Sequence, residues 1–67
     1  MEHIAINGRD CALPGPITVD QLLERSGLAG KRVAVERNGA VVPKSRHHRE
    51  WIRQGDRIEI IVAVGGG

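Results

Sequence analysis

Three glycines end the chain, Gly65, Gly66 and Gly67, and their placement suggests chemistry more than that of any other residues. Glycine usually supplies a positive φ in a turn between two elements, but no element follows this run. Three extended residues without side chains span about 10 Å, so they can carry the Gly67 carboxylate into a narrow cleft of another protein. A glycine-rich terminus is also typical of an end that simply frays, so the context of the run must decide.

A carboxylate such as that of Gly67 is a poor electrophile until it is activated, typically as an acyl-adenylate. In carrier systems the carrier brings the reactive group, and a partner enzyme supplies orientation and electrostatics. We therefore expect any chemistry at Gly67 to be performed by partners.

The other candidate clusters indicate a solvated surface. His47 and His48 stand next to Glu50, but no cysteine or second histidine cluster accompanies them at metal-ligand spacing. We therefore expect an exposed polar crossover there and no metal site. Asp20 and Glu24 are four residues apart on a predicted helix, where they form a solvated face rather than a catalytic pair. No catalytic residue is predicted.

Charge and cysteine content argue against further functions. There are 10 lysines and arginines against 8 acidic residues, a net charge of +2. Lys44, Arg46, Arg49 and Arg53 are expected to form a solvated basic face. The chain has no Phe or Tyr to stack on bases, so nucleic-acid binding is not expected. The lone Cys11 cannot form an internal disulfide and is expected to be a small strand residue.

With 67 residues, 40% of them hydrophobic, the chain has the size of one small domain. We expect that domain over residues 1–64 and a flexible glycine tail over residues 65–67. A thin aliphatic core leaves little room for an enclosed pocket, so an enzyme active site is not expected. The sequence has no stretch of about 20 apolar residues and no secretory leader, which favours a cytoplasmic protein without a membrane segment.

The N-terminal half predicts a hairpin followed by a helix. Residues 3–7 and residues 10–13 alternate as strands do, and Asn7-Gly8 between them is a hairpin turn signal. Thr18 is expected to cap the helix, with Gln21 completing a capping box. The predicted buried face of the helix consists of Val19, Leu22 and Leu23. The helix is expected to stop at Gly27, and Leu28 is expected to fold back over it.

The C-terminal half predicts a second hairpin, with strands over residues 32–37 and 40–42 joined by the turn Asn38-Gly39. A crossover over residues 44–54 and a last strand over residues 57–64 follow. Within the crossover we expect one turn of helix near residues 48–51, which places Trp51 or Ile52 on the core. The residues of the last strand expected to face inward are Ile58, Ile60, Val62 and Val64.

This order of elements predicts an α+β fold in which one main helix packs on one face of a mixed sheet of four to five strands. The first and last strands are expected to pair in parallel at the centre of the sheet. That arrangement is the ubiquitin-like β-grasp.

The other face of the sheet offers a docking surface near the tail. By alternation, Glu59, Ile61 and Ala63 point outward from the last strand, and Ala34 points outward from a neighbouring strand. An exposed aliphatic patch of this kind is a plausible contact for partner enzymes, although a single exposed isoleucine is common.

The sequence resembles the ThiS family, the sulfur carriers of thiamin biosynthesis, over essentially its whole length. The segments that carry the resemblance are Ile6-Asn7-Gly8, residues 18–23, residues 33–39, Val42-Pro43, residues 55–60 and residues 63–67. The combination of "VAVERNG", "VVP", "GDRIEI" and a terminal diglycine is more specific than any one of these alone.

The resemblance implies a cycle of reactions at Gly67. An E1-like, ThiF-type enzyme would use ATP to adenylate its carboxylate, and a persulfide donor would convert the adenylate to a thiocarboxylate. A ThiG-type thiazole synthase would then take the sulfur. The carrier itself is expected to be a monomer, to hold no stably bound cofactor and to catalyse nothing.

Two kinds of alternative remain open from the sequence. The small subunit of molybdopterin synthase shares the fold, the diglycine end and the thiocarboxylate, although its chains are usually longer in the crossover, and other carriers serve cysteine synthesis or tRNA thiolation. A ubiquitin-like binding module or protein modifier would use the same terminus without sulfur chemistry.

Overall fold

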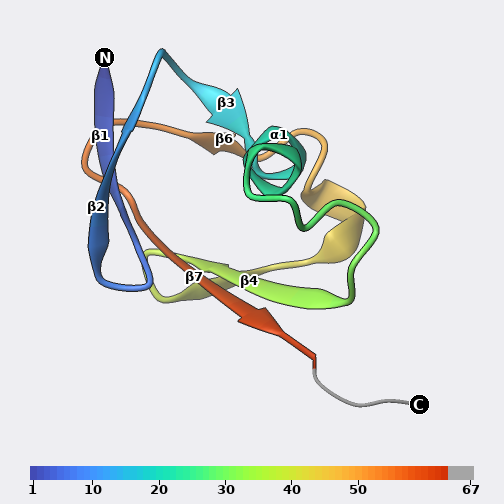
Figure 1. Ribbon diagram of the computed structural model, residues 1–67. Coiled ribbons are helices and arrows are strands. Elements are labelled where there is room, and N and C mark those ends of the chain that lie inside the picture. Colours follow the sequence, from blue (N-terminus) through green and yellow to red (C-terminus); the bar gives the residue numbers. More distant parts are fainter. Residues whose placement is uncertain (64–67) are drawn as a thin grey trace.

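The structure, a computed structural model, describes residues 1–63 (Figure 1). Its elements in chain order are β1 (Glu2–Ile6), β2 (Arg9–Leu13), β3 (Ile17–Thr18), α1 (Val19–Arg25), β4 (Val33–Arg37), β5 (Ala40–Val42), a 3₁₀ helix (Lys44–Arg46), β6 (Trp51–Ile52) and β7 (Arg57–Val62).

The main sheet has five strands in the order β2-β1-β7-β4-β5. Its centre is the parallel pair of β1 and β7, and the other neighbours are antiparallel. Helix α1 lies over one side of this sheet, together with the small antiparallel sheet of β3 and β6 (Figure 1). The predicted mixed β-grasp sheet with one covering helix is confirmed.

Both predicted hairpin turns are present, and their backbone explains the Asn-Gly pairs. Asn7 and Gly8 have φ of 49° and 81°, and Asn38 and Gly39 have φ of 53° and 87°. Two consecutive positive φ values define the type I′ turn that matches the twist of a hairpin. The Asn7 side chain also accepts a hydrogen bond from the backbone N–H of Ile60 at 2.8 Å, which ties the first turn to β7.

The ends of α1 follow the predicted capping chemistry. The hydroxyl of Thr18 accepts from the backbone N–H of Gln21 at 3.2 Å, and the Gln21 side chain accepts from the Thr18 N–H at 2.9 Å. At the other end, the N–H of Leu28 donates to the carbonyl of Leu23 at 2.8 Å, and Gly27 has a φ of 72°. This is a Schellman motif, and it leaves a helix of only seven residues.

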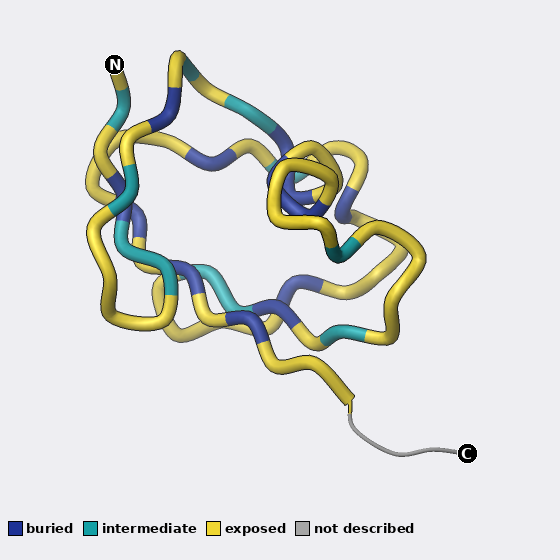
Figure 2. Tube along the Cα trace, viewed as in Figure 1, coloured by how far each residue is buried: buried dark blue, intermediate teal, exposed yellow. Residues whose placement is uncertain are grey.

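A single aliphatic core lies between the helix and the sheet. Its buried members are Ile4, Leu13, Val19, Leu22, Leu23, Val35, Val42, Ile52, Ile58 and Ile60. Figure 2 shows buried and exposed positions alternating along the first part of β7, as expected for a strand with one covered face. A helix this short is marginal alone, so this burial holds it in place.

The crossover differs from the prediction. Its helical turn is the 3₁₀ helix at Lys44–Arg46, before the predicted position near residues 48–51. The residues after it instead form β6, where Ile52 pairs with Ile17 of β3. Ile52 is completely buried in this pairing, whereas Trp51 is 47% exposed. Of the two residues predicted for the core, Ile52 therefore occupies it and Trp51 does not.

The prediction that His47 is exposed was wrong, because the 3₁₀ helix turns it inward. His47 is 4% exposed, and its Nε2 lies 3.0 Å from the carbonyl oxygen of Val42. Its own carbonyl accepts from the backbone N–H of Asp20, so this histidine joins the crossover to α1. His48 is exposed as predicted.

The end of β7 also departs from strict alternation. Val62 was predicted to face inward but is 40% exposed. Val62 pairs with Val33 of β4, whereas the pairing of β7 with β1 ends at Ile58, so the last part of β7 has a strand on one side only. The strand ends at Val62 rather than at the predicted residue 64, and Val64 lies outside the described residues.

Candidate docking face and chain end

Strand β7 positions the predicted docking residues on the side of the sheet away from α1. Ile58 and Ile60 are buried, whereas Glu59 between them is exposed and Ile61 is 60% exposed. Ala34 of β4 lies directly opposite Ile61 in the antiparallel register and is also exposed. The predicted outward orientation of Glu59, Ile61 and Ala34 is therefore confirmed, whereas their role in docking is a prediction.

Two further residues complete this surface, and the docking prediction did not include them. Glu36 lies opposite Glu59 in the β4–β7 register, and Val41 of β5 lies opposite Glu36 on its other side. Val41 is 70% exposed. The signal was available, because alternation in the predicted strand over residues 32–37 places Glu36 on the same face as Ala34.

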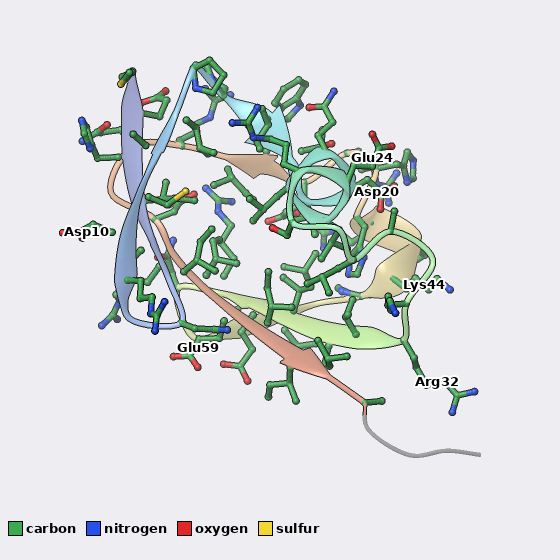
Figure 3. All side chains as sticks on the ribbon, in the orientation of Figure 1. Asp10, Asp20, Glu24, Arg32, Lys44 and Glu59 are labelled. Carbon is green, nitrogen blue, oxygen red and sulfur yellow. The ribbon has the colours of Figure 1, made fainter. Side chains whose placement is uncertain are left out.

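We call these five residues the open face: Ala34, Glu36, Val41, Glu59 and Ile61. Figure 3 shows Glu59 pointing away from the body of the fold, on the side opposite Asp20 and Glu24 of α1. Asp20 and Glu24 are exposed, as predicted for a solvated helix face.

The chain leaves the sheet next to the open face. Ala63 is exposed, and its backbone N–H donates to the carbonyl of Arg32 at 2.9 Å. Because Ala63 follows Ile61 by two residues, the point where the chain leaves the sheet is close to the apolar end of the open face. The predicted sulfur-bearing residue Gly67 and the tail residues Gly65 and Gly66 lie outside the described residues.

A second polar cluster lies at the other end of β7, and sequence reasoning missed it. Asp56 is 8% exposed, and its carboxylate accepts from Arg37 Nε at 2.7 Å, from Asn38 Nδ2 at 3.0 Å and from the N–H of Arg53 at 2.9 Å. Arg37 also donates to Glu50 at 3.1 Å. These contacts join the second hairpin turn, the crossover and the start of β7.

The electrostatics of this cluster are those of a partnered ion pair. Burial acts to raise the pKa of Asp56, but the hydrogen bonds from Arg37, Asn38 and the Arg53 N–H outweigh it, so the pKa lies below its ordinary value. The hydrogen bond to Asp56 is the main cause that raises the pKa of Arg37. Because the carboxylate is fully engaged, the cluster has no free group for acid–base work and serves the fold.

Residues 1–63 contain neither a metal-binding cluster nor a membrane-spanning helix. This part of the chain holds no group of three or more His, Cys, Asp and Glu side chains able to bind a metal ion, and no helix in it is long and apolar enough to cross a membrane. Cys11 lies within β2, half-buried against the core, which confirms the prediction of a small strand residue.

Comparison with known proteins settles the family. The sequence matches the ThiS family over residues 4–67. The chain belongs to this family. The sulfur carrier protein ThiS of Bacillus subtilis is 37% identical over 65 residues, which cover 96% of this chain and 98% of that protein. The predicted ThiS resemblance is confirmed.

The fold comparison agrees with the sequence comparison. The crystal structure of a thiamine biosynthesis protein (ThiS) from Geobacter metallireducens superposes with a TM-score of 0.83 at 28% identity, covering 97% of this chain and 99% of the other. This ThiS structure therefore shares the fold of the present protein.

A third relative is much longer. The thiazole synthase of Paramagnetospirillum magneticum is 39% identical over 64 residues. This chain spans only a fifth of the length of that protein, although 96% of the chain is matched.

Proposed function

We propose that this protein is a sulfur carrier of thiamin biosynthesis and that it carries sulfur as a thiocarboxylate on Gly67. The observation that supports this most is the family match, which extends to residue 67 and so includes all three terminal glycines. A relative matched over nearly its whole length is named as a sulfur carrier. The chemical steps use no side chain of the domain and need only an accessible chain end.

The proposed cycle begins with activation of the terminus. A Gly67 carboxylate oxygen attacks the α-phosphorus of ATP in an E1-like, ThiF-type enzyme, and pyrophosphate leaves. The terminal sulfur of a persulfide donor then attacks the acyl carbon, and AMP leaves. A thiol cleaves the resulting acyl disulfide, which releases the thiocarboxylate and leaves a disulfide between the thiol and the donor.

The fold supports this cycle by fixing where the terminus begins. The hydrogen bond from Ala63 to Arg32 anchors the chain beside the residue that precedes β4, and four residues follow Ala63. Extended, they reach about 13 Å, enough to enter an enclosed active site while the folded body stays at its mouth. The open face lies beside this starting point, so one docking event can orient the body and deliver the tail.

Thiazole synthase is the proposed acceptor of the sulfur. Two thiazole synthases, from Paramagnetospirillum magneticum and Magnetococcus marinus, contain a segment of 64 residues that is 39% and 36% identical to this chain. The presence of a similar segment within a thiazole synthase chain favours a thiazole synthase partner over the acceptors of molybdopterin synthesis or tRNA thiolation.

Intact-mass spectrometry tests the proposal. The 67-residue protein is incubated with the activating enzyme, ATP, a persulfide donor and a thiol, and we expect the mass change of replacing one oxygen by one sulfur. Addition of thiazole synthase and its other substrates should return the original mass. A protein that never gains sulfur would refute the carrier function, and a thiocarboxylate that thiazole synthase cannot consume would refute the proposed acceptor.

A further inference from the structure

The centre of the open face contains an unfavourable arrangement of charge. Glu36 and Glu59 are direct partners in the antiparallel register of β4 and β7, on the same face of the sheet. Directly opposite side chains have Cβ atoms about 5 Å apart, and two like charges in that arrangement destabilise a sheet. The fold therefore gains nothing from placing both carboxylates here.

Neither Glu36 nor Glu59 forms an ion pair within residues 1–63. The three ion pairs in this part of the chain join Arg37 to Glu50 and Asp56, and Arg46 to Glu50. Arg57 lies two residues before Glu59 in β7 and points outward as well, yet none of these three ion pairs joins it to Glu59. The protein as a whole carries a net charge of +2, so the acidic pair contrasts with a basic chain.

Exposed aliphatic side chains flank the carboxylates on two sides. Ile61, with Ala34 opposite it, lies towards the chain end, and Val41 lies beside Glu36 at the outer strand. Ile61 and Val41 are 60% and 70% exposed. The face thus combines a doubly negative centre with apolar surroundings, which is complementary to a long side chain that has an aliphatic stem and a cationic head.

We infer that the open face docks on a partner protein that presents an arginine between Glu36 and Glu59, with apolar side chains against Ile61 and Val41. The inference rests on the proposed function, because the partners are the enzymes that receive the tail. Arginine fits better than lysine, since its planar guanidinium offers five donors and can bridge two carboxylates. Two carboxylates alone are far from the six to eight oxygen ligands that calcium takes, and the negative charge repels nucleic acid.

The test is the adenylation of this carrier by its ThiF-type activating enzyme, with the Michaelis constant KM for the carrier as the readout. In the variant Glu36→Gln/Glu59→Gln we expect KM to rise about tenfold with kcat unchanged. The thermal midpoint should stay the same or rise, because a repulsion is removed. A purely structural role would not raise KM while preserving or improving stability. The salt dependence of KM should also weaken in this variant.

The matched control is Asp20→Asn/Glu24→Gln, which removes the same two charges from α1 on the other side of the sheet (Figure 3). It should leave KM near that of the unmodified protein. Equal KM values for the two double variants would overturn the inference. A self-association of the unmodified protein that Glu36→Gln/Glu59→Gln abolishes in sedimentation would also overturn it, because the occupant would then be a second copy of this chain.

The outcomes also separate the inference from the proposed function. If the unmodified protein is adenylated and gains sulfur but the glutamate variant behaves like its control, only the docking inference fails. If the unmodified protein gains no sulfur with any enzyme, the carrier function fails as well, and so does the inference that rests on it.

Discussion

The start and the middle of β7 lie beside polar clusters of opposite character. Asp56, just before the strand, is buried, its partner Arg37 at the end of β4 is half-buried, and each is held by two or more hydrogen bonds. Further along, Glu36 and Glu59 face each other across the sheet, and the ion pairs within residues 1–63 include neither. Charges that serve the fold are satisfied internally. Charges that stand together without partners indicate a surface completed by another molecule.

This comparison divides the molecule into two regions with separable roles. The inner region, made of the core and the Asp56 cluster, should control stability and affect function only through it. The outer region, made of the open face and the chain end, should control transfer of sulfur without affecting stability.

The largest effect is expected at the chain end. Removing Gly67, or adding one residue after it, should abolish thiocarboxylate formation, because it shifts the carboxyl carbon by about 3.3 Å and about 1 Å of misplacement can cost 10²-fold in rate. Intact-mass analysis measures the product, and thermal denaturation should show an unchanged midpoint. Cys11→Ser is the control and should gain sulfur normally. Sulfur on the extended protein would contradict the terminal mechanism.

The next effect is on the core. Leu23→Asp should unfold the domain, because Leu23 is 6% exposed and an unpaired carboxylate there costs several kcal/mol, of the order of the whole stability of a small domain. Circular dichroism should show loss of the cooperative thermal transition. Glu24→Asp, the adjacent exposed position on α1, serves as the control and should fold. A folded Leu23→Asp protein would show that α1 does not pack as described.

The sequence predicted the parts of the fold that local rules control. Asn7-Gly8 and Asn38-Gly39 require positive φ at both residues, and Thr18 with Gln21 forms a capping box wherever it starts a helix, so these features were correct. β6, the inward turn of His47 and the Asp56 cluster depend on contacts between residues far apart in the chain. Alternation identified the outward residues of the docking face, but it does not reveal that Glu36 and Glu59 are direct neighbours, which requires the strand register.

The Asp56 cluster should give a measurable pH dependence. The pKa of Asp56 is lowered in the folded protein, so its contribution is present at pH above the ordinary value and is lost as the pH falls through the lower, folded value. Asp56→Asn should cost about 2 kcal/mol near neutral pH. Urea denaturation at decreasing pH should show the two proteins converging below pH 3.8, the ordinary value for this group. A difference that is independent of pH would show that the charge of Asp56 does not stabilise the fold.

The smallest and most selective effect is expected at Ile61. Because Ile61 is 60% exposed, Ile61→Asp should change the free energy of unfolding by no more than about 0.5 kcal/mol, the range usual for surface substitutions. It should still raise KM for the activating enzyme several-fold, since it places a third negative charge where we expect an apolar contact. The neighbouring residue supplies a sharp control: Ile60 is 8% exposed, so Ile60→Asp should unfold the domain. If Ile61→Asp unfolds the domain instead, Ile61 contributes to stability, and the outer region does not affect function independently of the fold. If it folds and KM is unchanged, partners do not contact the apolar end of the open face.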